Sequence, residues 1–386
     1  MKKEKRLLVV SFVEIPPTND GCRNRAFNLI NFYKKLGYKI DYLYYDYFHY
    51  DTREMRKYFN SQLYIVKPEV SIKSKLKDWL RQYTYKTGLY KYVHIRYTAD
   101  EIYSDAVTKK ALELHRKNNY DAVMAIYFGM SKVFEAFDSK VIKILDSQDR
   151  FAYRDKIYLK NGLKPEFLYT NYVQERKALS RADVVLAIQK KEEKYYKWLL
   201  KDNAKVVTVG DLIPNKQAYL VKNKEVLFVG SSNTANIEGI SWFLKEVWPA
   251  VISRDSSSNL VFVGPCCNKI PDGEYSKLGV VDDLEEVYHN VRCVVNPVLF
   301  GTGLNIKSIE ALGNAKPLIT TMVGAKGINK KALIACSNSA EMAERIIDIL
   351  HNDKEAFEYS RRAQKFVEVY NSKNESQLKK CLKQED

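Results

Sequence analysis

The chain of 386 residues lacks the features that would place it in a membrane or an oxidising compartment. No apolar run approaches the roughly 18 residues needed to cross a bilayer. Its six cysteines include no C-x-x-C pair, which favours reduced thiols over disulfides or a zinc site. The basic N-terminus leads through a short apolar run into Glu14, Pro16 and Pro17, so we expect a first strand there and not a signal peptide. We therefore expect a cytoplasmic protein.

The formal net charge of +16 is unevenly placed. Residues 1–220 contain 42 Lys and Arg against 26 Asp and Glu, whereas residues 221–386 contain 21 of each kind. A uniformly basic chain would suggest a nucleic-acid partner. A basic half joined to a neutral half suggests two domains with different partners.

Strand-like and helix-like patterns alternate along the chain, and the alternation restarts after a linker at residues 210–215. The expected strands are residues 6–13, 39–45, 121–128, 140–146, 182–188 and 205–209, then 225–229, 260–263, 280–281, 291–295 and 317–320. The expected helices are residues 22–36, 100–118, 166–181 and 237–252, with three more stretches between 338 and 383. This order predicts an α/β chain of two doubly wound, Rossmann-like domains in tandem.

Loops at the carboxyl ends of strands bind ligands in such sheets, and two polar loops stand out first. The loop of residues 16–23 holds Asp20, Gly21 and Arg23 before a helix N-terminus, and it is equally consistent with a plain turn. The loop of residues 228–236 is small and polar, as a phosphate cradle would be, but it lacks the dinucleotide and P-loop fingerprints. The alternative for Asn236 is that it only caps the next helix.

The loop of residues 296–312 carries the strongest signal. Its Gly301-Thr302-Gly303 turn exposes amides at the start of a helix, where the helix dipole favours an anion. Lys307 and Glu310 are three residues apart and share one helix face. A cation near phosphates and a carboxylate that accepts two hydroxyl hydrogen bonds would together bind a nucleotide sugar. The alternative is a surface Lys–Glu pair on an ordinary helix.

Several short segments match one enzyme family. Those in the second half are Val226-Leu227-Phe228-Val229-Gly230, the stretch from Asn236 through Trp242-Phe243 to Trp248-Pro249, Gly301-Thr302-Gly303-Leu304, Lys307, Glu310-Ala311-Leu312, Lys316-Pro317, Thr320-Thr321 and Gly324-Ala325-Lys326-Gly327. Those in the first half are Asp146-Ser147-Gln148-Asp149, Arg154, Glu175-Arg176-Lys177-Ala178-Leu179 and Arg181-Ala182-Asp183. In these segments the chain resembles family 4 (group 1) retaining glycosyltransferases, strongly after residue 225 and more loosely before it.

The resemblance implies the GT-B fold, in which two Rossmann-like domains face a central cleft. It implies an acceptor-side domain at residues 1–212, a donor domain at residues 213–365, and a helix at about residues 366–386 that packs back on the first domain. It also implies retaining transfer from a nucleotide-diphosphate sugar. We expect a glycan or lipid-linked saccharide acceptor, in cell-surface polysaccharide assembly.

The resemblance also assigns residues. Glu310 matches a glutamate that binds donor hydroxyls, usually on the ribose, and Lys307 lies beside the loop that matches the diphosphate site. The expected nucleotide-binding residues are Gly230, Ser231, Ser232, Asn236, Gly301, Thr302, Gly303, Leu304, Asn305, Lys307 and Glu310. The expected contacts to acceptor or donor sugar are Asp20, Gly21, Arg23, Gln148, Asp149 and Arg154. Glu310, Lys307 and Asp149 are the expected catalytic residues, although Asp20 and Asp149 are equally consistent with helix caps.

Two positions depart from the family pattern. Thr302 stands where many members carry a second glutamate, and Gln148 stands where many carry a histidine. A glutamine keeps the hydrogen bond to a sugar but not the ionisable group. The departures therefore concern the sugar contacts more than the nucleotide site.

Two other functions stay open at this point. A nucleotide-sugar 2-epimerase shares the fold, although the donor loop favours a transferase. A non-enzymatic nucleic-acid-binding or adaptor protein would use the basic, aromatic first half. The sequence contains no recognisable nucleic-acid-binding motif, and this alternative does not explain the loop at residues 301–310. We therefore expect no nucleic-acid partner.

The segment of residues 71–83 has an amphipathic pattern. Its apolar members at helical spacing are Ile72, Leu76, Trp79, Leu80 and Tyr83, and its basic members are Lys73, Lys75, Lys77 and Arg81, followed by Lys86, Lys91 and Arg96. One interpretation is a helix that docks on an anionic membrane surface, which would make the protein peripheral on the inner membrane face. The other is a core-packing helix whose lysines are solvated.

The chain contains no Asp-x-Asp, the motif that metal-dependent glycosyltransferases of the other common fold need. In retaining transfer of the family type, the acceptor hydroxyl attacks the face from which the nucleotide diphosphate leaves. Helix N-terminal amides and Lys307 would then stabilise the leaving charge. We therefore expect neither a metal nor another cofactor.

Activity should persist in excess EDTA, because amides and Lys307 take the place of a cation. Initial transfer rates with EDTA, and after add-back of Mg²⁺ or Mn²⁺, measure this. A strict requirement that add-back restores would contradict the expectation.

Overall fold

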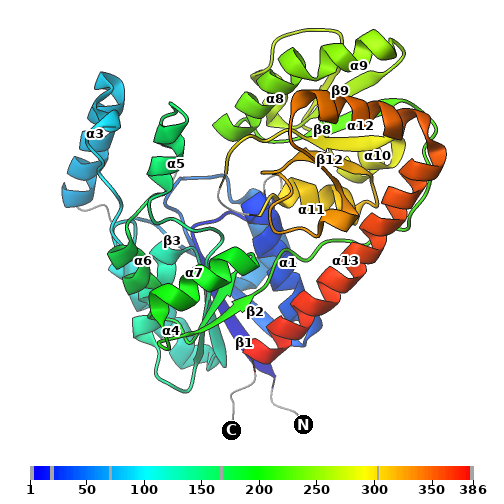
Figure 1. Ribbon diagram of the computed structural model, residues 1–386. Helices are drawn as coiled ribbons and strands as arrows, with labels where there is room; N and C mark the ends of the chain where they lie inside the picture. The colour runs from blue at the N-terminus through cyan, green and yellow to red at the C-terminus, as the bar shows by residue number, and fades with distance from the viewer. Residues whose placement is uncertain (1–3, 18–20, 69–71, 166–167, 302–303, 383–386) are drawn as a thin grey trace. The chain divides into compact units, whose positions relative to one another are not determined.

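The computed structural model describes residues 4–17, 21–68, 72–165, 168–301 and 304–382 (Figure 1). The chain divides into two compact units, Met1–Gly210 with Glu375–Asp386, and Asp211–Asn374. The long helix α13 (Asp353–Cys381) begins in the second unit, and its last residues belong to the first.

The first unit is built on a parallel sheet of seven strands in the order β3-β2-β1-β4-β5-β6-β7. The strands are β1 (Lys5–Ser11), β2 (Tyr38–Tyr45), β3 (Leu63–Val66), β4 (Ala122–Ile126), β5 (Ile142–Asp146), β6 (Val184–Ala187) and β7 (Lys205–Thr208). Leu7 faces Ile40 in β2 and Ala122 in β4. Residues Leu7–Val10 are fully buried, as expected of a parallel strand that is covered on both faces.

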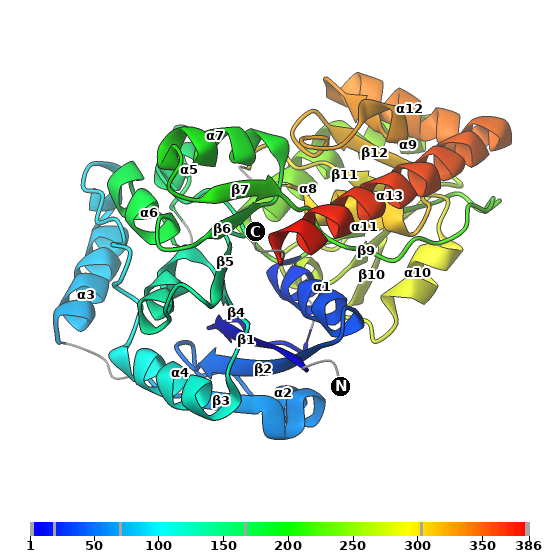
Figure 2. The same ribbon diagram turned by 90° about the horizontal axis from the view of Figure 1, so that it is seen from below.

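The first unit contains helices in addition to its sheet. They are α1 (Gly21–Lys35), α2 (Arg53–Phe59), α3 (Ile72–Thr87), α4 (Asp105–Asn118), α5 (Arg154–Lys160), α6 (Tyr172–Leu179) and α7 (Lys190–Leu200), with 3₁₀ helices η1 (Asn60–Gln62), η2 (Leu89–Lys91) and η3 (Phe128–Ala136). Helix α1 lies on one face of the sheet and α4 on the other (Figure 2). The side chain of Ser104 caps the start of α4, and α4 buries Val107, Ala111 and Leu114 at helical spacing.

The second unit has a parallel sheet of six strands in the order β10-β9-β8-β11-β12-β13. The strands are β8 (Glu225–Val229), β9 (Asn259–Val263), β10 (Ser276–Gly279), β11 (Cys293–Asn296), β12 (Leu318–Thr321) and β13 (Ile334–Cys336). Helices α8 (Thr234–Glu246), α9 (Trp248–Arg254) and α12 (Ser339–His351) cover one face, whereas α10 (Leu284–Asn290) and α11 (Ile306–Gly313) cover the other (Figure 1). Short 3₁₀ helices η4 (Pro265–Asn268) and η5 (Lys330–Ala332) complete the unit.

The core of the second unit lies between its sheet and the helices α8, α9 and α12. Phe228 and Phe262 from the sheet meet Phe243, Trp248 and Ile346 from the helices in one buried cluster. Each large apolar side chain that leaves water in this way stabilises the fold by about 1.5–3 kcal/mol. This core fixes the ends of β8 and α8 on which the site described below depends.

The expected architecture is confirmed in its two parallel, helix-covered sheets, with several corrections to individual elements. The expected helix at residues 237–252 is two helices, because the chain breaks at Val247 and Pro249 lies in the first turn of α9, where its missing N–H costs no hydrogen bond. The strand expected at residues 280–281 lies at Ser276–Gly279. The stretches expected between residues 338 and 383 are two helices, α12 and α13.

No described helix is both long and apolar enough to cross a membrane. All six cysteines are free thiols, and every one except Cys22 is buried.

Candidate functional site

The sheet of the second unit changes winding direction between β8 and β11. These strands are hydrogen-bonded neighbours, with Cys293 opposite Val226, although their connections run to opposite sides of the sheet. In doubly wound sheets ligands bind outside the carboxyl ends of the strands at such a point. The loops that leave β8 and β11 are the second and third loops singled out in the sequence, so the topology brings both to one edge.

Two glycines allow neighbouring segments to approach closely at this edge, one between α8 and the loop after β11, the other between the loops after β8 and β9. A Cβ atom at Gly239 in α8 would lie 2.7 Å from the carbonyl oxygen of Pro297, in the loop after β11. A Cβ atom at Gly264 would lie 2.5 Å from the carbonyl oxygen of Gly230, and its φ of +103° suits glycine. Larger side chains at either position would push the loops apart.

Asn236 and Lys307 join the two loops through a hydrogen bond. The ammonium group of Lys307 donates to the side-chain oxygen of Asn236 and lies 5.0 Å from the centroid of the Phe228 ring. The Asn236 amide donates to the carbonyl oxygen of Ser231 at 2.9 Å. The cap of α8 is Asn233, whose side chain accepts from the backbone N–H of Asn236. The alternative that Asn236 only caps the helix is therefore wrong.

Desolvation moves the pKa values of Lys307 and Glu310 toward each other. Desolvation lowers the pKa of the Lys307 ammonium group to about 8, against the opposing influence of Cys266 and Glu310. Desolvation, followed by the nearby Asp211 carboxylate, raises the pKa of Glu310 to about 7. Among the described residues, none donates a hydrogen bond to the Glu310 carboxylate. Desolvation therefore disfavours the charged forms of both groups, and a ligand with negative charge and hydroxyl groups would stabilise them.

Most of the remaining residues expected to bind nucleotide are described by the structure. Leu304 is buried, Asn305 precedes α11 without a side-chain cap bond, and Ser232 is exposed. The carbonyl oxygen of Gly301 accepts from Lys326 at 3.3 Å. Thr302 and Gly303 lie outside the described residues.

The end of β12 and the segment after it hold the loop after β11 in place. The hydroxyl of Thr321 donates to the carbonyl oxygen of Val298 and accepts from the backbone N–H of Gly324 at 3.1 Å. The hydroxyl of Ser308 donates to the carbonyl oxygen of Gly324 at 3.0 Å. The sequence signalled this segment only through its family resemblance, because its role is to hold another loop.

A second polar group lies at the carboxyl edge of the sheet in the first unit. Arg25 of α1 pairs with Asp146 at the end of β5, with 2.7 Å between Nη2 and Oδ1, and both side chains are fully buried. The Gln148 amide donates to Asp146 at 2.6 Å, and its backbone has a φ of +62°. The pair therefore fixes Gln148 in place. Sequence reasoning missed Arg25, because it is one polar residue in a helix that starts with several.

Asp149 and Arg154 form an ion pair with 3.1 Å between Nη1 and Oδ2. Asp149 also accepts from the backbone N–H of Arg150 at 2.7 Å, and the residue that precedes α5 is Tyr153. Asp149 is therefore not a helix cap. Burial, and then the neighbouring Asp149 carboxylate, raise the pKa of Glu192 to about 8. The sequence did not signal Glu192.

The first loop is only partly described. Gly21 is the first residue of α1, and Asp20 lies outside the described residues. Arg23 pairs with Glu14 at 3.2 Å and lies 5.1 Å from the centroid of the Tyr50 ring. The expected sugar contacts that the structure describes thus lie at the carboxyl edge of one sheet, where the Arg25–Asp146 pair supports Gln148.

Residues 223–352 match the family model for glycosyl transferases group 1. This part of the chain is similar to the domain that the model describes. This domain contains the Lys307–Glu310 pair and the loop after β8, and it confirms the expected family and class of enzyme for the second unit. In the described part of the chain, no group of three or more His, Cys, Asp or Glu side chains is arranged to hold a metal ion.

One curated relative aligns with part of the chain. It is described as an uncharacterized 44.6 kDa protein in the cps region of Klebsiella pneumoniae, and it is 26% identical over 169 residues. The alignment covers 39% of this chain and 44% of that protein, so it spans less than half of either.

Solved glycosyltransferase structures superpose along nearly the whole chain. A variant of Staphylococcus aureus TarM in complex with UDP has a TM-score of 0.66, 11% identity and coverage of 98% of this chain and 100% of its own. Sucrose-phosphate synthase from Thermosynechococcus elongatus has a TM-score of 0.65, 15% identity and coverage of 97% and 98%. The pneumococcal O-GlcNAc transferase GtfA has a TM-score of 0.65, 12% identity and coverage of 99% and 100%. At such identities the likeness shows the GT-B fold.

Replacing Arg25 by Met should lower the free energy of unfolding by about 3–5 kcal/mol, because it leaves the Asp146 carboxylate buried without its partner. Denaturant unfolding followed by circular dichroism measures this. The double variant Arg25→Met/Asp146→Leu should recover most of the loss. The matched control is Lys57→Met, since Lys57 pairs with Glu54 in solvent and should change stability by less than about 1 kcal/mol. Equal losses for Arg25→Met and Lys57→Met would contradict the proposed role of the pair.

Proposed function

We propose that this chain is a retaining, metal-independent glycosyltransferase that uses a nucleotide-diphosphate sugar. The observation that carries the proposal is the position of Lys307 and Glu310, both desolvated by partial burial, at the switch point of the second sheet and inside the matched region. The proposed acceptor is a glycan or lipid-linked saccharide in cell-surface polysaccharide assembly. The relative in a cps region supports that setting.

The two groups divide the donor between them. Lys307 lies in the first turn of α11, where free amides and the helix dipole favour an anion, so we assign it to the diphosphate. An anion beside a desolvated ammonium group restores its positive charge. Glu310 lies one turn further and has a carboxylate available for hydroxyl hydrogen bonds, so we assign it to the ribose. The complexes of TarM and GtfA with UDP support a nucleoside diphosphate as the leaving group.

In the proposed reaction the acceptor hydroxyl attacks the anomeric carbon on the face from which the diphosphate leaves. The bond from that carbon to the phosphate oxygen breaks, a glycosidic bond forms, and the hydroxyl proton passes to the departing diphosphate. Lys307 and the amides of α11 stabilise the negative charge that develops on this group. The protein needs no nucleophile of its own in this scheme.

Gln148 has a role that is consistent with this scheme. Its amide nitrogen donates to Asp146, so its amide oxygen is the acceptor left for a sugar hydroxyl. The buried Arg25–Asp146 pair fixes that oxygen and its direction. A histidine at this position would add a titrating group, whereas glutamine positions the sugar without one.

A donor-hydrolysis screen over a panel of nucleotide sugars tests the proposed function. Release of a nucleoside diphosphate from one donor class, increased by an added saccharide acceptor, is the expected result. Conversion of the donor to its 2-epimer would instead support the epimerase, and tight binding of single-stranded RNA without donor turnover would support the nucleic-acid-binding alternative.

Glu310→Ala should lower kcat/KM by about 10²–10³, because the loss of one preorganised polar contact typically has that effect. Circular dichroism should show a folded variant. The matched control is Glu344→Ala, which removes an exposed glutamate from α12 of the same unit. Full activity of Glu310→Ala with normal donor affinity would refute the assignment.

Affinity for a nucleoside diphosphate should be greatest between about pH 7 and pH 8. Below about pH 7 the Glu310 carboxylate gains a proton and loses acceptor capacity, whereas above about pH 8 Lys307 loses its charge. Calorimetric titration with UDP between pH 5.5 and 9.5 measures both limbs. Glu310→Gln should remove the fall in affinity at acid pH, except for the part that the titration of UDP itself causes. Lys307→Met should remove the fall in affinity at alkaline pH. An identical profile in all three proteins would contradict the assignment.

A further inference from the structure

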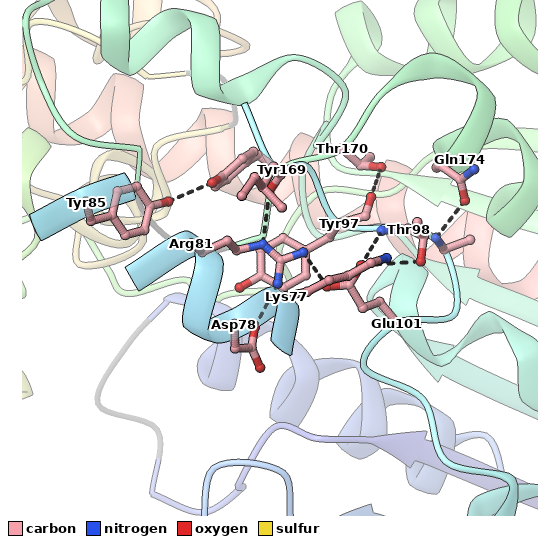
Figure 3. Close-up of polar contacts among 12 residues, drawn as sticks. Lys77, Asp78, Arg81, Tyr85, Tyr97, Thr98, Glu101, Tyr169, Thr170 and Gln174 are labelled. Carbon is pink, nitrogen blue, oxygen red and sulfur yellow. Dashed lines mark hydrogen bonds and ion pairs between the residues drawn. The ribbon is translucent and has the colours of Figure 1, made fainter. Parts of the chain in front are cut away.

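Helix α3 is attached to the first unit through its polar side. Arg81 is 2% exposed, donates to the carbonyl oxygen of Ile95 at 2.9 Å, and pairs with Glu101 (Figure 3). Its guanidinium carbon lies 3.6 Å from the centroid of the Tyr97 ring. A second charge partner is Asp78, one turn earlier in α3, at 2.7 Å. These contacts fix the helix against the segment that follows it.

Further polar contacts extend this attachment along the helix. Lys77 pairs with the buried carboxylate of Glu101 at 3.2 Å, and the hydroxyl of Tyr85 lies 2.7 Å from that of Tyr169 (Figure 3). Arg96, beyond the helix, pairs with Asp155 at 2.7 Å. The expectation that Lys77, Arg81 and Arg96 belong to a free basic surface is therefore wrong, since each has a carboxylate partner.

The apolar side of α3 faces away from the unit. Leu76, Trp79 and Tyr83 recur at helical spacing, and their exposed fractions are 56%, 59% and 48%. The rings of Trp79 and Tyr83 stack with centroids 5.7 Å apart. A surface helix ordinarily turns such a stripe toward the core. Because the stripe of α3 is exposed instead, the interpretation of α3 as a core-packing helix is wrong. A contiguous exposed apolar patch of this kind marks an interaction surface.

Basic side chains border this patch. Lys75 and Lys86 are exposed and lie on one flank of the stripe, four residues before Trp79 and three residues after Tyr83. The one acidic residue of α3, Asp78, is paired with Arg81. The exposed residues directly beyond the helix are Leu89, Lys91, Tyr92 and Val93. The outward surface thus combines apolar and aromatic groups with positive charge.

We propose that the outward face of α3, defined by Leu76, Trp79, Tyr83, Lys75 and Lys86, docks on an anionic lipid bilayer. Tryptophan and tyrosine are the side chains that favour the boundary between headgroups and hydrocarbon. Lysines beside them complement anionic headgroups, in keeping with the charge excess of residues 1–220. A second copy of the chain fits less well, because two such faces would bring four lysines together. The inference is independent of the donor site.

Flotation with large unilamellar vesicles tests the docking surface. Wild-type protein should bind vesicles of phosphatidylcholine with 30% phosphatidylglycerol, and binding should fall as salt rises from 50 to 500 mM. Leu76→Ser/Trp79→Ser should lower the partition coefficient at least tenfold. The matched control is Trp198→Ser, which removes a tryptophan of similar exposure, 63%, from α7 of the same unit and should bind as wild type.

Charge is tested separately. Lys75→Ala/Lys86→Ala should lower partitioning into anionic vesicles roughly 25-fold, since each basic side chain near an anionic leaflet contributes about a factor of five. Lys109→Ala/Lys117→Ala, which removes two exposed lysines from α4, is the matched control and should change partitioning much less. Circular dichroism and calorimetric titration with UDP should match wild type in all four variants, which separates this test from that of the donor site.

Three results would overturn the proposal. They are equal binding to anionic and to pure phosphatidylcholine vesicles, absence of binding to both, and binding that the changes at Leu76, Trp79 and the lysines leave intact. Sedimentation velocity without lipid supplies a further check. A dimer that Leu76→Ser/Trp79→Ser dissociates would assign the face to a second copy of the chain instead.

Discussion

Parallel pairing of strands that are buried on both faces is the constraint on which both units depend. It requires a crossover connection between successive strands, usually a helix, and it places all the carboxyl ends of a sheet at one edge. Residues from distant parts of the chain therefore meet there without any local signal. Asn236 and Lys307 are joined in this way in the second unit, and Arg25 and Asp146 in the first.

The two edges hold their charges in different ways. Arg25 and Asp146 are wholly buried and neutralise each other, which suits a pair that supports another residue. Lys307 and Glu310 are desolvated, but Glu310 has no hydrogen-bond donor among the described residues, and their pKa values are displaced toward neutrality. Groups with perturbed pKa values and unused bonding capacity are typical of binding sites. The first pair supports its neighbour, whereas the second has the properties that the proposed donor site requires.

The sequence predicted the architecture and the central pair because both leave local patterns. Apolar runs such as Leu7–Val10 predict buried strands, and Lys307 and Glu310 share a helix face by spacing alone. The short edge strands β3 and β13 escaped because three or four residues give too little periodicity. Arg25, Glu192 and the loop support from Thr321 escaped because their meaning lies in partners far along the chain.

Helix α3 shows the same limit at its sharpest. An amphipathic pattern reveals that a helix has two faces, but it does not reveal which one faces the protein. Glu101, 20 residues beyond Arg81, decides the matter by pairing with both Arg81 and Lys77, and Tyr97 adds an aromatic ring beneath the guanidinium group. The buried Glu101 carboxylate needs these cations. Turning the apolar stripe of α3 inward would leave that carboxylate without its partners. The polar contacts that attach α3 therefore also keep Trp79 and its neighbours in solvent, and the exposure of the stripe is a consequence of the fold.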